Sequence, residues 1–146
     1  MPAARRTSRA ILRYFVPLYA LAVVVQIFLA GEGIFGAEGS PTNDDMSATL
    51  NAHRDFGYVL AEPGAFLLLV VALFAWLPNK RERWLSVALP FVLWIQLPLT
   101  LSRWSGAFHP LNAFVILGLL GFLSRALWQA PAGQLEAPEA QPSPDL

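Results

Sequence analysis

The chain has 146 residues, of which 55% are hydrophobic and only 14% are charged, and its formal net charge is zero. A soluble domain is normally about one quarter charged, so the composition argues against a soluble globular protein. The balanced charge provides no basic surface for nucleic acid. The absence of cysteine excludes disulfides, thiolate nucleophiles and thiolate metal sites.

Four long apolar blocks dominate the sequence, at residues 11–30, 56–77, 84–101 and 111–128. Each block has about 18–22 residues, the length that an α-helix needs to cross roughly 30 Å of hydrocarbon. Because backbone groups in lipid must be paired within their own segment, we predict that each block is a helix. The sequence therefore predicts an all-α, up-down-up-down four-helix transmembrane bundle over residues 11–128, in contact with the lipid bilayer.

Charged residues outside the blocks and at their ends are distributed unevenly across the predicted membrane. One side receives most of the basic residues: Arg5, Arg6, Arg9, Arg13, Lys80, Arg81, Arg83 and Arg125. The other side receives Arg54, Arg103 and the acidic residues of the first loop. The positive-inside rule then places both termini in the cytoplasm. Arginine outnumbers lysine nine to one, a bias typical of GC-rich bacterial genomes, so we expect a multi-pass protein of the bacterial inner membrane.

The two ends of the chain are expected to lie outside the bundle. Residues 1–10 form a basic cytoplasmic N-tail, and residues 129–146 form an acidic tail rich in proline and alanine that we predict to be disordered. The arginine-rich start resembles a secretory signal. The first block is longer than the roughly 7–15 apolar residues of such signals, so we predict a retained span, with a cleaved signal as the alternative.

Polar side chains inside or at the mouths of apolar spans are costly and indicate functional sites. Five stand out: Gln26, His53, Glu62, Gln96 and His109. By the predicted topology all except Glu62 fall in the outer half of the bundle, one from each span. His53 and His109 are the only histidines in the chain.

The two histidines are predicted to face each other. In an up-down-up-down bundle the second and fourth spans are parallel and diagonal, with axes roughly 12–14 Å apart. Two imidazoles across that distance can bind one iron at the centre of a porphyrin, whereas structural zinc needs four ligands. Haem b is therefore the cofactor that suits the pair best. The alternative is that both histidines only cap helices or bind headgroups and water.

Neighbouring polar and small residues would complete this predicted cofactor site. Gln26, Gln96 and Asn112 would orient the ligands or the haem propionates. Gly57 and Gly64 share a helix face with His53 and make that face shallow. A shallow face either lets a neighbouring helix approach closely or leaves room for a flat ligand.

Glu62 stands apart from this group. It follows His53 by nine residues and lies about 13 Å deeper, near mid-membrane. The spacing also points it away from His53. We interpret it as a candidate proton or quinone site, or as a neutral acid paired with a neighbouring helix or another subunit.

Three short patterns carry a resemblance: Gln-x-x-Leu-Ala-Gly at 26–31, His-Arg-x-x-Gly at 53–57 and His-Pro-x-Asn at 109–112. Together they resemble a family of small, uncharacterised four-span bacterial membrane proteins. More distantly, a histidine followed four residues later by glycine near the end of a span resembles b-type cytochromes and ferric-reductase-like membrane domains. Those domains carry two histidine pairs for two haems. This chain has one pair, so at most one haem with two histidine ligands is possible per chain.

Three functions follow as hypotheses. The first is a membrane protein that binds one b-type haem for electron transfer or redox sensing. The second is a non-catalytic accessory or scaffold subunit, in a homo-oligomer or a larger membrane complex. The third is a small proton-coupled carrier that uses Glu62. No catalytic residues are predicted, and we do not expect an enzyme.

Overall fold

The computed structural model describes residues 3–36 and 48–129. The predicted tail from residue 130 onward and the middle of the first loop lie outside the described residues. Within the described residues there is no strand, and four helices are long and apolar enough to cross a membrane: Ala3–Gly36, Asn51–Ala75, Lys80–Thr100 and Arg103–Gln129. The protein is a multi-pass membrane protein with an all-α fold, as the apolar blocks predict.

Each span is longer than its apolar block, and three of them are composite. The first is one helix, α1 (Ala3–Gly36), which includes most of the residues predicted as a basic tail. The second joins α3 (Asn51–Val59), a π-helical turn η1 (Leu60–Gly64) and α4 (Ala65–Ala75). The third joins α5 (Lys80–Ile95) to a 3₁₀ turn η2 (Pro98–Thr100), and the fourth joins α6 (Arg103–Gly106) to α7 (Phe108–Gln129).

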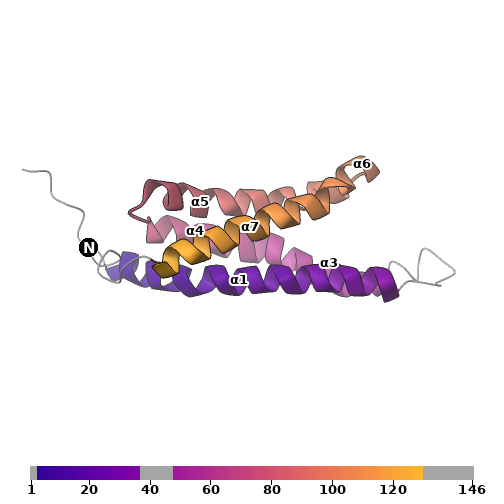
Figure 1. Ribbon diagram of the computed structural model, residues 1–146, viewed down its shortest axis with the longest axis horizontal. Coiled ribbons are helices and arrows are strands. Elements are labelled where there is room, and N and C mark those ends of the chain that lie inside the picture. Colours follow the sequence, from indigo (N-terminus) through magenta and orange to yellow (C-terminus); the bar gives the residue numbers. More distant parts are fainter. Residues whose placement is uncertain (1–2, 37–47, 130–146) are drawn as a thin grey trace, which may run out of the picture.

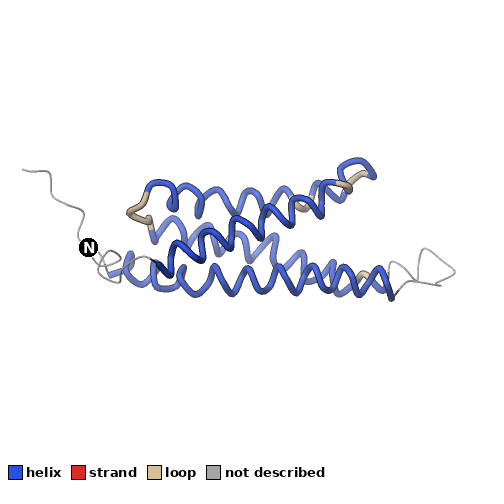
Figure 2. Tube along the Cα trace, in the orientation of Figure 1, coloured by secondary structure: helices blue, strands red, loops and turns tan. Residues whose placement is uncertain are grey.

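The four spans run alternately up and down (Figures 1 and 2). Packing follows a ring, in which α1 contacts α4 and α7, and α5 also contacts α4 and α7. The second and fourth spans therefore lie diagonally across the bundle, as expected for this topology.

The most deeply buried apolar side chains are concentrated toward one end of the bundle. We call the end where α1 and α5 begin the arginine end, and the end where α3 and α7 begin the histidine end. Side chains buried toward the arginine end include Leu12, Val16, Leu68, Leu89, Leu120, Leu123 and Leu127, and the core continues past the middle at Val23, Leu93 and Ile116. Toward the histidine end the pair α1 and α3 diverges from α5, α6 and α7 (Figure 1). The polar residues predicted from the sequence lie in this less tightly packed half.

Arg9 joins the first two spans at the arginine end. Its side chain is only 4% exposed. Its Nε donates to the Ala75 carbonyl and one terminal nitrogen donates to the Trp76 carbonyl, both at 2.9 Å. Here α4 ends on Trp76, which has a left-handed backbone (φ 37°). The last carbonyls of a helix have no partner within it, and a cation is favourable there. Arg9 thus caps α4.

We predict that Arg9→Met destabilises the fold. The substitution keeps much of the apolar stem but leaves two carbonyls without this donor, at a cost of about 1–3 kcal/mol. Thermal unfolding of the detergent-solubilised protein should show a lower midpoint. Arg6→Met is the matched control, because Arg6 is exposed and its replacement should leave the midpoint unchanged. Equal midpoints for the two variants would contradict the capping role.

Candidate functional site

His53 and His109 lie next to each other across the diagonal of the bundle, with their ring planes nearly perpendicular. Their ring centroids are 6.2 Å apart and the ring planes meet at 76°. His53 comes from the first turn of α3 and His109 from the first turn of α7, and both are half-buried. The fold therefore brings together the two histidines that the sequence predicts to meet.

Both imidazoles are oriented by a backbone carbonyl on a neighbouring helix. His53 Nδ1 lies 3.0 Å from the Gln26 carbonyl oxygen, and His109 Nδ1 lies 3.3 Å from the Gln96 carbonyl oxygen. A carbonyl can only accept, so each Nδ1 carries the hydrogen. In the neutral ring the lone pair is then on Nε2, and within the described residues neither Nε2 has a hydrogen-bond partner. In this tautomer Nε2 is free to bind a metal.

The same glutamines also bind the histidine backbones. Gln26 Nε2 donates to the His53 carbonyl at 2.7 Å, and Gln96 Nε2 donates to the His109 carbonyl at 3.0 Å. Each glutamine thus accepts from the ring with its backbone and donates to the main chain with its side chain. We call each reciprocal pair a glutamine–histidine clamp. One clamp joins the first two spans and the other joins the last two.

Gly57 makes the first clamp sterically feasible. In a helix the His53 carbonyl faces the residue four positions on, which is Gly57. A Cβ on Gly57 would lie 2.7 Å from Gln26 Nε2, so a larger residue would displace the amide. The shallow face was predicted either to let a neighbouring helix approach closely or to leave room for a flat ligand. At Gly57 the structure shows the close approach of a helix, α1.

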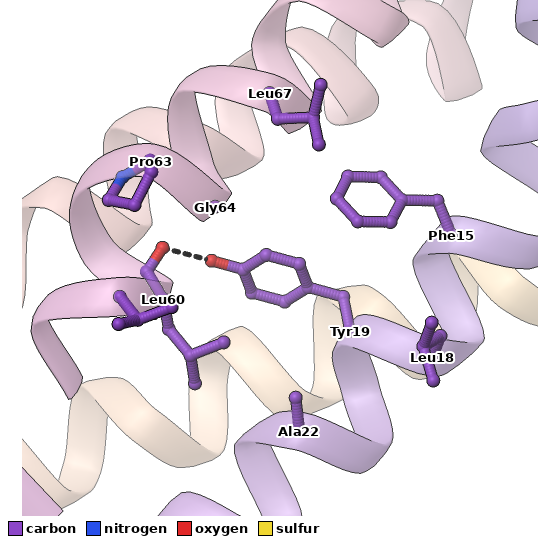
Figure 3. Close-up of a pocket in the computed structure, with 9 residues that line it drawn as sticks. Phe15, Leu18, Tyr19, Ala22, Leu60, Pro63, Gly64 and Leu67 are labelled. Atoms are coloured by element: carbon purple, nitrogen blue, oxygen red, sulfur yellow. Dashed lines mark hydrogen bonds between the residues drawn. The ribbon is translucent and has the colours of Figure 1, made fainter. Parts of the chain in front are cut away.

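Gly64 repeats this arrangement one heptad along the second span. Its Cβ would lie 3.2 Å from the ring and the hydroxyl oxygen of Tyr19. The Tyr19 hydroxyl donates to the Leu60 carbonyl (Figure 3), four residues before Gly64. Tyr19 and Gln26 are seven residues apart, as are their two acceptors. Sequence analysis missed Tyr19, although this shared spacing of seven is a signal that could have found it.

The two clamps differ in one respect. Asn112 Nδ2 donates to Gln96 Oε1 at 2.6 Å and to the Val92 carbonyl at 3.2 Å, so the second clamp is braced. The position that corresponds to Asn112 in the second span is Phe56, three residues after His53. Gln26 Oε1 is accordingly buried without a hydrogen-bond partner among the described residues. Both polar atoms of the Gln96 amide thus form hydrogen bonds, whereas among the described residues the Gln26 amide forms them only through its nitrogen.

Glu62 does not belong to this site. It lies in η1, on the exposed side of the second span, and makes no hydrogen bond to any described residue. It thus remains separate from the histidines, as its spacing predicts.

An apolar groove of about 310 Å³ lies between α1 and the second span (Figure 3). Its lining residues are Phe15, Leu18, Tyr19, Ala22, Val59, Leu60, Pro63, Gly64 and Leu67. The Tyr19 hydroxyl is already bonded to the main chain, so the groove offers no group for acid–base chemistry. It does not include the histidine pair.

Comparisons with protein-family models, curated proteins and solved structures find no match for this chain. The resemblance of the three short patterns to a four-span family therefore stays a prediction, and the function is argued from the site alone.

We predict that Gly57→Ala lowers the stability of the fold and that Gly118→Ala does not. Gly57→Ala should lower the unfolding midpoint, because the new methyl group displaces the Gln26 amide at a cost of about 1–3 kcal/mol. Gly118→Ala is the control, since no atom lies within 4 Å of its Cβ position. It should be neutral or stabilising by up to about 1 kcal/mol, because alanine favours helix. Thermal unfolding in one detergent measures both, and a Gly57→Ala protein as stable as Gly118→Ala would contradict the clamp.

Proposed function

We propose that this protein is a membrane-bound b-type haem protein in which Nε2 of His53 and Nε2 of His109 bind one iron from opposite sides. The main support for this proposal is the distance between the His53 and His109 rings. For metal–nitrogen bonds of about 2.0–2.1 Å, two imidazoles on opposite sides of one metal have ring centroids roughly 6 Å apart. The observed separation is 6.2 Å.

The donor set favours a porphyrin over a protein-only metal site. Within the described residues there is no group of three or more His, Cys, Asp or Glu side chains that could hold a metal ion. Zinc sites use three or four protein ligands, and a histidine pair alone is too few. A porphyrin brings four nitrogens of its own and needs only the two axial ligands.

The clamps suit axial ligands. A ligating histidine almost always donates its other ring N–H to a carboxylate, a carbonyl or water, which fixes the ring and raises its basicity. The Gln26 and Gln96 carbonyls fill this role here. The side-chain amides of the same residues hold the two helices that present the rings, so the ring separation is supported by backbone as well as by side-chain bonds.

The proposed chemistry is the transfer or sensing of one electron. Bound haem supplies a one-electron change at iron, and two protein ligands leave no open position for a substrate. The chain therefore has no need of catalytic residues. By the positive-inside rule the histidine end faces the outside of a bacterial inner membrane and both termini face the cytoplasm, so a redox partner reaches the site from the outer face.

An absorption spectrum tests this function. Protein expressed with ample haem precursor and purified in detergent should show a reduced-minus-oxidised change in the Soret and α bands. His53→Ala and His109→Ala should each abolish the signal of a six-coordinate haem, while Gly118→Ala should keep it. A wild-type protein without a chromophore, or a histidine variant with an unchanged spectrum, would overturn the proposal. In that case the clamps would be structural and the accessory-subunit hypothesis would stand.

We predict that the braced clamp contributes more to haem retention than the other. The Gln96 side chain bonds to the His109 carbonyl and to Asn112, whereas the Gln26 side chain bonds only to the His53 carbonyl. Replacement of either glutamine by leucine keeps the backbone carbonyl that orients the ring and removes only the side-chain bonds. Gln96→Leu should therefore release haem to apomyoglobin faster than Gln26→Leu. The reverse order would show that the brace does not support the site.

A further inference from the structure

Glu62 is a carboxyl group on the outside of the bundle at the middle of a span. It is the twelfth residue of the 25-residue span Asn51–Ala75, and its side chain is exposed. Its neighbours on the same face are also exposed: Tyr58 at 51%, Val59 at 54% and Phe66 at 61%. No described residue donates to it or accepts from it. The surface formed by these four residues is the Glu62 face.

An isolated carboxyl in hydrocarbon is unfavourable. A charge at mid-membrane costs several kcal/mol, and such residues almost always find a partner or a water-filled cavity. A neutral carboxyl still leaves a donor and an acceptor without bonds. Among residues 3–36 and 48–129, the bundle supplies neither a partner nor an aqueous cavity on the Glu62 face. A hydrogen-bond partner contributed by a second molecule at this depth would remove the cost.

We infer that the Glu62 face is the contact surface for a second copy of this chain, in which the two Glu62 carboxyl groups hydrogen-bond to each other across a two-fold axis. In a two-fold contact the same surface is used by both copies, so a residue on the axis meets itself. A neutral carboxyl is both donor and acceptor. Two of them satisfy each other, and no second polar residue is needed on the Glu62 face.

The surroundings fit such a contact. The face carries no basic or amide side chain, so the carboxyl is its only polar group at this depth apart from the Tyr58 hydroxyl. Val59 lies three residues before Glu62 and Pro63 directly follows it, and both line the apolar groove. Figure 3 shows Pro63 at the groove, which gives the second copy an apolar recess beside the carboxyl pair. Glu62 lies in a π-helical turn, and such turns are frequent at functional sites.

This inference is independent of haem binding. The histidine pair is complete within one chain, and Glu62 is not in contact with it. The absorption spectrum and the dimer can therefore fail separately, and the thermal unfolding midpoint of each Glu62 variant reports whether the fold is intact.

Two substitutions at Glu62 separate a hydrogen-bonded pair from a merely apolar contact. Subunit stoichiometry is measured by single-molecule photobleaching of fluorescently labelled protein in dilute liposomes. Wild type should dimerise, and Glu62→Leu should weaken the dimer by about tenfold, the scale of a buried polar pair in membranes. Glu62→Gln should dimerise nearly as well as wild type, because an amide is also both donor and acceptor.

Cysteine crosslinking locates the interface, because the chain has no cysteine of its own. Val59→Cys should form a disulfide-linked dimer under a membrane-permeant oxidant. Phe114→Cys, which is 63% exposed on the fourth span, should not. A monomeric wild type, an undiminished Glu62→Leu dimer, or equal crosslinking at both positions would each overturn the inference. So would a Glu62 face that crosslinks to a different protein in native membranes.

Discussion

The glutamine–histidine clamp is the interaction on which the rest of the structure depends. It joins antiparallel neighbours by two hydrogen bonds of opposite direction, so neither helix can slide or rotate without loss of both. Lipid gives little hydrophobic driving force between helices, and packing and polar contacts must specify the arrangement. The two clamps do so at the histidine end, where the spans diverge and few side chains are fully buried. Each clamp thus fixes one pair of helices, at the end where the two pairs pack least against each other. Each pair contributes one of the two neighbouring imidazole rings.

Composition and residue position were sufficient to predict the architecture and the pairing of the histidines. Block length predicts four spans because hydrocarbon thickness is a fixed physical constraint. Chain order then places the second and fourth spans on a diagonal, and the only two histidines stand at equal depth on them. Gln26, Gln96 and Asn112 were predicted to orient the haem ligands or the propionates, and this stays a prediction. In the structure their side-chain amides bind the His53, His109 and Val92 carbonyls, and the Asn112 amide also binds Gln96.

The bonding within the site could not be predicted, because it depends on which face of one helix meets which carbonyl of another. Gly57 illustrates this point. Its missing side chain is visible in the sequence, but the group that fills the space, the Gln26 amide, is known only from the packing of α1 on α3. Arg9 was counted among the flanking charges by its position, whereas the structure buries it on the end of α4. The π-helical turn also escaped prediction, since Pro63 alone is compatible with a simple kink.

Three side chains of α1 form hydrogen bonds that determine how the first span lies against the second. Arg9, Tyr19 and Gln26 are spaced along about half of the 34-residue helix α1. Each donates to a carbonyl of the second span, at Ala75, Leu60 and His53 respectively. The order of these three donors along α1 is the reverse of the order of their acceptors along the second span. The bonds therefore fix the antiparallel register of the two helices. A leader peptide that is cut away after export would take all three donors with it and leave His53 without its orienting carbonyl. The first span is thus a structural part of the histidine site, because it supplies the carbonyl that orients His53 and the donors that fix the second helix beside it.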